Sequence, residues 1–278
     1  MEIQEGYKPQ EIITKENLPS ILNNIATERE KKGTSEILIP HIHRVREQAE
    51  KLGDVSSVVQ LYQEEFLSAH HMIMEEKSRK LRANPLRAAK GMLIMKSTSK
   101  SMEKYLEKDD KDLNPTIKAR IFRFLGRYSD MKGQYAKSED YYRKGLSHFD
   151  SLTTPEERFN RLEFLGFLSY SLVKQGKEEG IDLTKQTLKD FDESNEGNWL
   201  KEKDYYTWAV WKSGIEIRTA EHILKTKKTE HVDMANNFLN NAESTLKMPD
   251  GNTEVFRLRL DELNSAKGQL QQKGSSTV

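Results

Sequence analysis

Apolar residues recur at intervals of three and four along most of this chain, with polar residues between them. Val55, Val58 and Leu61 begin one such run, and Trp208 and Trp211 begin another. This spacing places apolar side chains on one face of an α-helix, whereas the alternation typical of a half-buried strand is absent over any strand-length stretch. The pattern therefore predicts an all-α protein. The expected helices span residues 17–32, 36–52, 54–81, 85–107, 115–131, 134–150, 155–175, 177–192, 200–226, 230–247 and 252–270.

Prolines support several of these helix starts. In Asn84–Pro85, Asn114–Pro115 and Thr154–Pro155, a residue that caps helix N-termini precedes a proline at the first helical position. The segments 107–115 and 190–198 are polar and predict loops between helices.

No shift in composition divides the chain, so we expect a single helical domain over residues 16–270. Residues 1–15 are weakly patterned and predict a poorly ordered N-terminal tail. The polar residues 271–278 predict a disordered C-terminal tail.

Two glycines fall inside expected helices, on either side of a third glycine at a turn. Gly126 and Gly145 each cost their helix about 1 kcal/mol relative to alanine. Gly133 lies between them, where the chain is expected to reverse. A glycine in a helix allows a neighbouring helix to approach closely, and the closer packing offsets the lost helix propensity. The glycines therefore predict a tight helical hairpin that packs closely on its neighbours.

Residues 119–152 resemble the tetratricopeptide repeat, a helical hairpin with the pattern W-x2-L-G-x2-Y…A-x3-F. The matching positions are Phe122, Leu125, Gly126, Gly133, Tyr135, Ser138, Tyr142, Gly145 and Leu146. Ser129 and Asp150 depart from it, because tyrosine and proline are usual there. Residues 169–188 repeat the plan with Gly176 at the turn, Gly180 at the small position and Leu188 near the end, at a longer spacing that implies longer helices.

The resemblance implies a right-handed superhelical solenoid of antiparallel helix hairpins, with weaker copies at 49–66 and 234–246. It also implies a non-catalytic scaffold whose concave face binds proteins or peptides. In the family, the first helix of each repeat lines that concave face.

Three arginines follow one face of the first helix of the best-matched repeat. Arg120, Arg123 and Arg127 are three and four residues apart, and the resemblance implies that this face borders the groove and meets solvent. Guanidinium groups bind carboxylates and phosphates in a bidentate manner, so we expect an acidic peptide or acidic helix as the ligand. Gln134 and Tyr170 are expected to flank the same groove. The alternative is a solvated basic face neutralised by nearby acidic side chains.

Charge and composition narrow the possible functions. The chain has 45 basic and 44 acidic residues, so no overall attraction to nucleic acid or to anionic membranes is expected. The absence of cysteine excludes disulfides, thiolate metal sites and cysteine nucleophiles. No apolar run is long enough to cross a membrane, and the N-terminus lacks the apolar segment of a signal peptide. We therefore expect a cytoplasmic protein.

No motif for metal, cofactor or catalysis is recognisable. His41 and His43 are two residues apart and lie on different helix faces. His70 and His71 precede Glu75, but neither a Glu-x-x-His nor a His-Glu-x-x-His motif is present. We expect no metal, no cofactor and no enzymatic activity. A peptide- or metabolite-sensing module that acts through protein contact remains the alternative to a scaffold.

Overall fold

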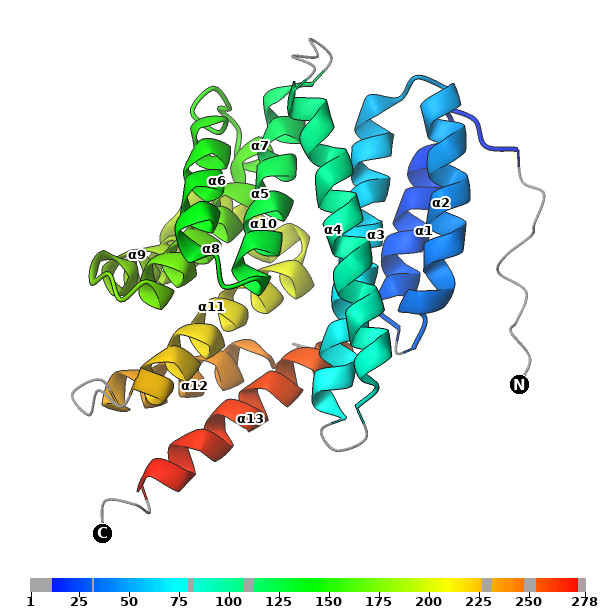
Figure 1. Cartoon of the computed structure of the whole chain (residues 1–278). Coiled ribbons are helices and arrows are strands. Elements are labelled where there is room, and N and C mark those ends of the chain that lie inside the picture. The colour runs from blue at the N-terminus through cyan, green and yellow to red at the C-terminus, as the bar shows by residue number, and fades with distance from the viewer. Residues whose placement is uncertain are drawn as a thin grey trace. The chain divides into compact units, whose positions relative to one another are not determined.

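A computed structural model of the protein describes residues 12–31, 33–79, 83–107, 113–226, 232–247 and 254–274, and these residues form helices and no strands (Figure 1). The predicted all-α class is confirmed. The chain divides into two compact units, Met1–Leu113 and Asn114–Val278, where the sequence predicted one domain. The division falls at the end of a polar segment that, in sequence, is like other loops between helices.

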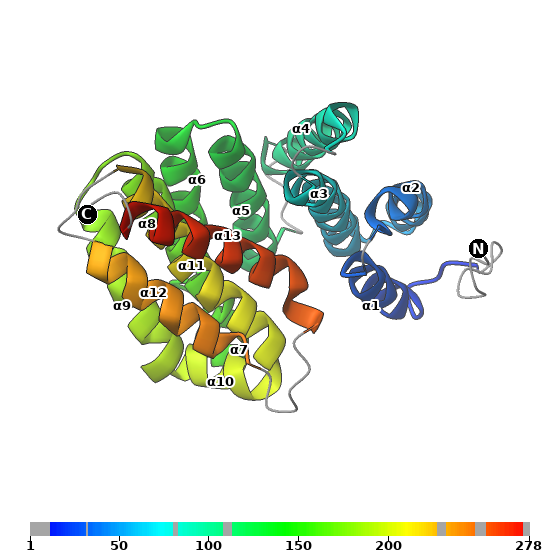
Figure 2. The same ribbon diagram turned by 90° about the horizontal axis from the view of Figure 1, so that it is seen from below.

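Unit 1 comprises α1 (Leu18–Arg29), α2 (Ser35–Lys51), α3 (Val55–Ser78) and α4 (Pro85–Glu107). Helix α3 contacts each of the other three, and Figure 2 shows it between α4 and the α1–α2 pair. An apolar cluster joins α1, α2 and α3, and it includes Leu18, Ile25, Ile42, Val45 and Leu61.

Buried carboxylates on α3 supplement this small core. Arg29 of α1 donates to Glu64 at 2.8 Å, and Arg87 of α4 donates to Glu75 at 2.9 Å and to Glu76 at 2.8 Å. A buried carboxylate that stays charged is strongly destabilising unless it is paired, so these contacts fix how α1 and α4 lie on α3.

Unit 2 is built of helices, six of which pack as three antiparallel pairs. Its helices are α5 (Pro115–Met131), α6 (Tyr135–Ser147), α7 (Pro155–Arg158), α8 (Asn160–Lys174), α9 (Glu179–Glu193), α10 (Asn195–Lys203), α11 (Tyr205–Thr226), α12 (Val232–Thr245), the 3-10 helix η3 (Glu254–Phe256) and α13 (Arg257–Gly274). The pairs α5/α6, α8/α9 and α11/α12 pack as hairpins, and α6 contacts α8, α8 contacts α11, and α11 contacts α13. Figures 1 and 2 show the hairpins following one another in chain order.

Most predicted helices are present, and those over 85–107 and 115–131 have the predicted bounds. The predicted loop over 190–198 is wrong, because α9 continues to Glu193 and α10 begins at Asn195. The Ser194 side chain accepts a hydrogen bond from the Gly197 backbone N–H at 3.0 Å, and Leu200 is buried. This short helix therefore has an N-terminal cap and a buried leucine. The polar composition of the segment led to the wrong prediction of a loop.

The described residues include only a small part of the predicted tails. Helix α13 extends to Gly274, so the first residues of the predicted C-terminal tail are helical. Residues 275–278 and residues 1–11 of the predicted N-terminal tail lie outside the described residues.

The close helix contacts predicted for Gly126 and Gly145 are present. A Cβ atom at Gly126 would overlap the Tyr142 ring, and one at Gly145 would overlap the Phe164 ring. Buried Asp130 of α5 joins the same helices, because it accepts hydrogen bonds from the Tyr142 hydroxyl at 2.6 Å and the Ser171 hydroxyl at 2.7 Å. The α5/α6 hairpin is thereby bound closely to α8.

Candidate functional site

One face of α8 carries the central side chains of the candidate site. Glu163, Phe167, Tyr170 and Lys174 are spaced four, three and four residues apart, so they lie on one side of the helix. Helix α8 contacts both α5 and α11, and most of its residues are buried. Side chains from three helices can therefore meet over this face.

Three guanidinium groups surround the Phe167 ring. The Cζ atom of Arg127 lies 4.4 Å from the ring centroid, that of Arg218 lies 5.5 Å from it, and that of Arg123 lies 5.9 Å from it. Arg123 and Arg127 belong to α5, and Arg218 belongs to α11. Attraction between a cation and the face of an aromatic ring accounts for each contact but does not neutralise the charge.

Carboxylates neutralise only some of the neighbouring arginines. Arg123 donates to Glu163 at 2.5 Å, and the Arg123 side chain is only 17% exposed. Arg259 of α13 pairs with Glu262. In the part of the chain that the structure describes, neither Arg127 nor Arg218 forms an ion pair. The charges of Glu163 and Glu262 also act on Arg127 and Arg218, but these two carboxylates are shared among four arginines, which leaves an excess of positive charge.

The pKa shifts reflect this arrangement. Burial, together with the charges of Arg259 and Arg127, lowers the pKa of Arg218 to about 10. Burial raises the pKa of Tyr170 to about 12, against the opposing effect of Arg218. Near neutral pH, Arg218 is therefore a cation and Tyr170 a neutral hydroxyl. Among the described residues the Tyr170 hydroxyl has no hydrogen-bond partner, so it is available to a ligand.

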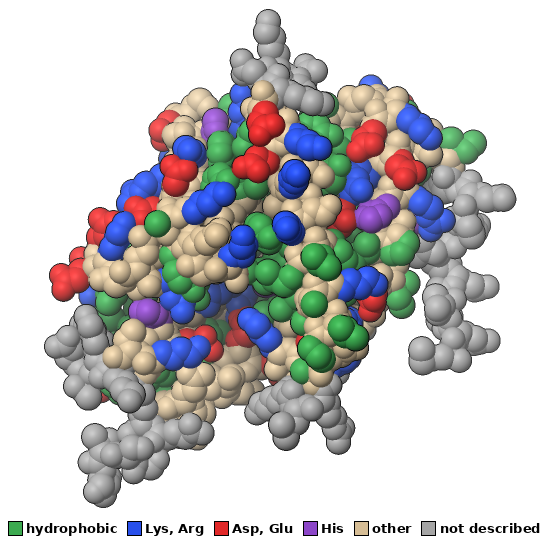
Figure 3. All heavy atoms as spheres, viewed as in Figure 1, with side chains coloured by type: hydrophobic (Ala, Val, Ile, Leu, Met, Phe, Trp, Pro, Cys, Tyr) green, Lys and Arg blue, Asp and Glu red, His purple; other side chains and the backbone are tan. Residues whose placement is uncertain are grey.

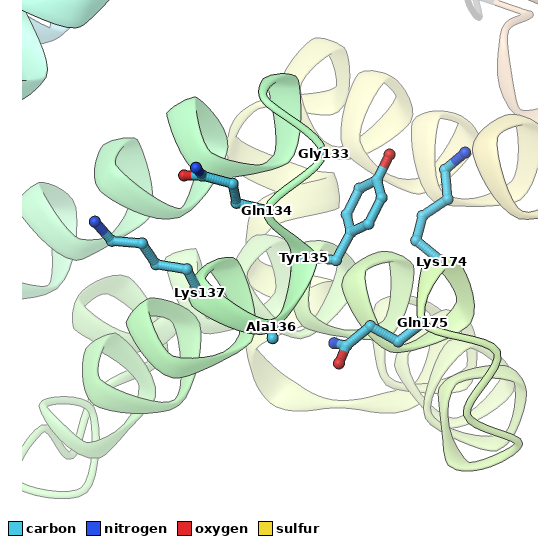
Figure 4. A pocket seen from close by; sticks show the side chains of 7 residues that line it. All are labelled: Gly133, Gln134, Tyr135, Ala136, Lys137, Lys174 and Gln175. Atoms are coloured by element: carbon cyan, nitrogen blue, oxygen red, sulfur yellow. The ribbon is translucent and has the colours of Figure 1, made fainter.

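A shallow pocket adjoins these residues at the turns of the first two hairpins (Figure 4). Its volume is about 510 Å³, and its lining residues are Gly133, Gln134, Tyr135, Ala136, Lys137, Lys174 and Gln175. The Tyr135 and Tyr170 rings meet edge to face at 6.4 Å, and the Lys174 Nζ lies 5.4 Å from the Tyr170 centroid. Tyr170 therefore contacts two residues that line the pocket.

The structure brings together only part of the predicted site. Arg123 and Arg127 lie over the Phe167 ring, and the charges of Arg218 and Arg127 act on Tyr170. Figure 4 shows Gln134 projecting to the same side as Lys137, away from the direction of Tyr135 and Lys174. The expected solvent exposure of the arginine stripe is wrong for Arg123, because Glu163 from the neighbouring helix α8 covers and pairs with it.

Arg120 is half-buried, and in the described residues its guanidinium group does not contact the Phe167 ring. Burial lowers its pKa, and Arg123 lowers it further.

The sequence analysis did not identify Phe167 or Arg218 as site residues. Phe167 has the spacing of a core residue. Arg218 lies in an otherwise largely buried stretch of α11, between Ile217 and Thr219. An isolated arginine in such a stretch is the one sequence signal that would have marked the site.

The histidines considered as metal ligands have protein neighbours. The His43 Nε2 atom lies 2.6 Å from a carboxylate oxygen of Glu65, and the His71 Nδ1 atom lies 3.3 Å from the backbone oxygen of Arg29. Among the residues described, no three histidine, aspartate or glutamate side chains are grouped closely enough to hold a metal ion.

Comparison with protein-family models finds no match to the chain, and comparison with characterised proteins finds no significant relative. None of the helices in the described ranges combines the length and hydrophobicity that a membrane span requires.

Proposed function

We propose that unit 2 is a non-catalytic module that binds a peptide or a segment of another protein on the face shared by α5, α8 and α11. The arginine face is defined here as Arg127, Phe167, Tyr170 and Arg218. We further propose that the hairpins form a right-handed, tetratricopeptide-like solenoid with this face on its concave side. The order of helix packing in unit 2 and the close contacts at Gly126 and Gly145 support this proposal.

The observation that carries the function is the unbalanced charge around Phe167. Arg127 and Arg218 both approach this ring, and no described carboxylate pairs with either. Like charges in a half-buried site repel one another, so an anionic ligand relieves a cost that the free protein bears. Two arginines and a tyrosine hydroxyl favour carboxylate oxygens, and the aromatic rings favour an apolar neighbour. The proposed ligand is therefore an acidic segment that also carries apolar side chains.

The same groups favour binding over catalysis. Arginine guanidinium groups stay protonated near neutral pH, and a tyrosine with a pKa of about 12 stays neutral, so neither exchanges protons readily with a substrate. A sensing module that signals by protein contact is the second candidate. The division into two units favours it, because one unit can bind the ligand while the other contacts a protein.

Affinity capture from a native lysate tests the proposed function. The wild-type protein is expected to retain a partner through an acidic segment, and added salt is expected to weaken the retention. Arg127→Glu and Arg218→Glu are expected to lose that partner. Lys185→Glu, which reverses an exposed charge on α9, is the matched control and is expected to retain it. Retention of the same partner by both arginine variants contradicts the proposed site.

A further inference from the structure

One face of helix α4 in unit 1 packs against α3. Gly91, Met95, Thr98 and Met102 are buried, and they follow one another at helical spacing. A Cβ atom at Gly91 would lie 2.8 Å from the backbone oxygen of Ala69 on α3, so the two helices are in close contact. This face fixes α4 against α3 and determines which residues point outward.

The first half of the remaining face is apolar. Leu86 is 80% exposed and Leu93 is 67% exposed, and Ala89 is exposed between them. The two leucines are seven residues apart, which is two helical turns, so they lie in one row along α4. Figure 3 shows apolar side chains gathered over this half of α4.

The second half of the same face is basic. Lys96, Lys100 and Lys104 repeat at every fourth residue and are exposed. Among the described residues none of the three forms an ion pair, whereas Lys90 nearby donates to Glu36 of α2 at 2.6 Å. Figure 3 shows Lys and Arg side chains following one another up this half of the helix. The outer face of α4 is defined as Leu86, Ala89, Leu93, Lys96, Lys100 and Lys104.

We propose that the outer face of α4 docks an amphipathic helix of a partner protein, apolar along one half and acidic along the other. The leucines and lysines extend over about 27 Å, the length of five helical turns. Charge complementarity selects the partner, because three unpaired lysines attract glutamate or aspartate and set the direction in which the helix lies. The leucine row supplies an apolar surface that the apolar residues of the partner helix would bury. This surface belongs to unit 1, so it is separate from the arginine face of unit 2.

Site-specific photo-cross-linking in the full chain tests the docking surface. A photoreactive phenylalanine derivative replaces Leu93 in one variant, Lys100 in a second and Ile37 in a control, and each is irradiated in native lysate. Ile37 on α2 is 65% exposed, which is similar to the exposed fraction of Leu93. It does not belong to the outer face of α4. We expect position 93 to cross-link to the apolar half, and position 100 to the acidic half, of one helical segment. Position 37 is expected not to reach it.

Glutamate substitutions give the second measurement, with the cross-linked segment as a synthetic peptide. Leu93→Glu and Lys100→Glu are each expected to weaken binding about tenfold or more, while Ile37→Glu leaves it unchanged. All three positions are exposed, and unchanged melting temperatures verify that the variants fold. Cross-links within the chain or to a second copy of it, cross-links that match the control, or unchanged peptide affinity overturn the proposal.

Discussion

Single residues of unit 2 differ sharply in how their charge is balanced. Glu163 is buried and paired with Arg123. Arg127 of α5 and Arg218 of α11 are half-buried, and neither forms an ion pair with a described residue. Glu216 of α11 is 1% exposed, and one of its carboxylate oxygens has no hydrogen-bond partner. These residues are expected to respond differently to substitution and to pH.

Replacing Arg123 and Arg127 separately tests the distinction between a structural and a free arginine. Arg123→Gln leaves the buried Glu163 carboxylate unpaired, so we expect it to lower the free energy of unfolding by about 3–5 kcal/mol. Arg127→Gln removes a cation without an ion pair and is expected to change stability by less than about 1 kcal/mol. Chemical denaturation measures both. Equal losses in the two variants would contradict the charge balance described for the site.

Glu216 is expected to make stability depend on pH. Burial, with a smaller contribution from nearby Asp192 and against the effect of Lys212, raises its pKa to about 8. The folded protein therefore retains a proton that the unfolded chain loses above its ordinary pKa of 4.5. Stability contributed by this group falls as pH rises from about 4.5 to about 8. Glu216→Gln is expected to reduce the fall in melting temperature over this window. A parallel fall in both proteins would rule out Glu216 as its source.

Among the helices, several N-terminal ends lie where a capping residue precedes a proline, and several close helix contacts lie at glycines. The Asn114 side chain accepts a hydrogen bond from the Ile117 backbone N–H at 2.9 Å, as its place before a proline predicts. Thr154 and Glu157 form a reciprocal capping box at the start of α7. Gly145 instead has a long-range role, because it makes room for Phe164 of the next hairpin.

Two glycine-to-alanine substitutions separate helix propensity from helix packing. Both Gly145 and Gly268 lie inside helices, but no atom lies within 4 Å of a Cβ at Gly268. Gly268→Ala is expected to stabilise the protein by about 1 kcal/mol through helix propensity. Gly145→Ala places a methyl group against the Phe164 ring and is expected to destabilise it by about 1–3 kcal/mol. Thermal or chemical unfolding compares them, and the same sign of change in both variants would contradict the packing.

At the scale of the whole molecule, the division after Leu113 separates two sets of helices that each have their own buried residues. The arginine face lies wholly within unit 2 and the outer face of α4 wholly within unit 1. Two surfaces of different chemistry therefore belong to two different units.

A fragment of residues 114–278 is expected to fold without unit 1. It begins at the Asn114 cap and retains the hairpins with their apolar core. We expect it to unfold cooperatively and to retain the partner that depends on Arg127 and Arg218. Circular dichroism during heating and affinity capture measure the two properties. A fragment without a cooperative transition would show that unit 2 depends on unit 1 for its stability.

The helical class, most helix bounds and the tight α5/α6 hairpin could be predicted from the amino-acid sequence. These depend on local properties, namely the spacing of apolar residues, the prolines with their caps, and glycines at positions of close approach. Which arginines are neutralised depends instead on tertiary packing. Glu163 pairs with Arg123 across 40 positions of the chain, and Arg218 reaches Phe167 from another hairpin. The division after Leu113 likewise depends on which helices pack together, because packing between residues distant in the chain leaves no local signal in the sequence.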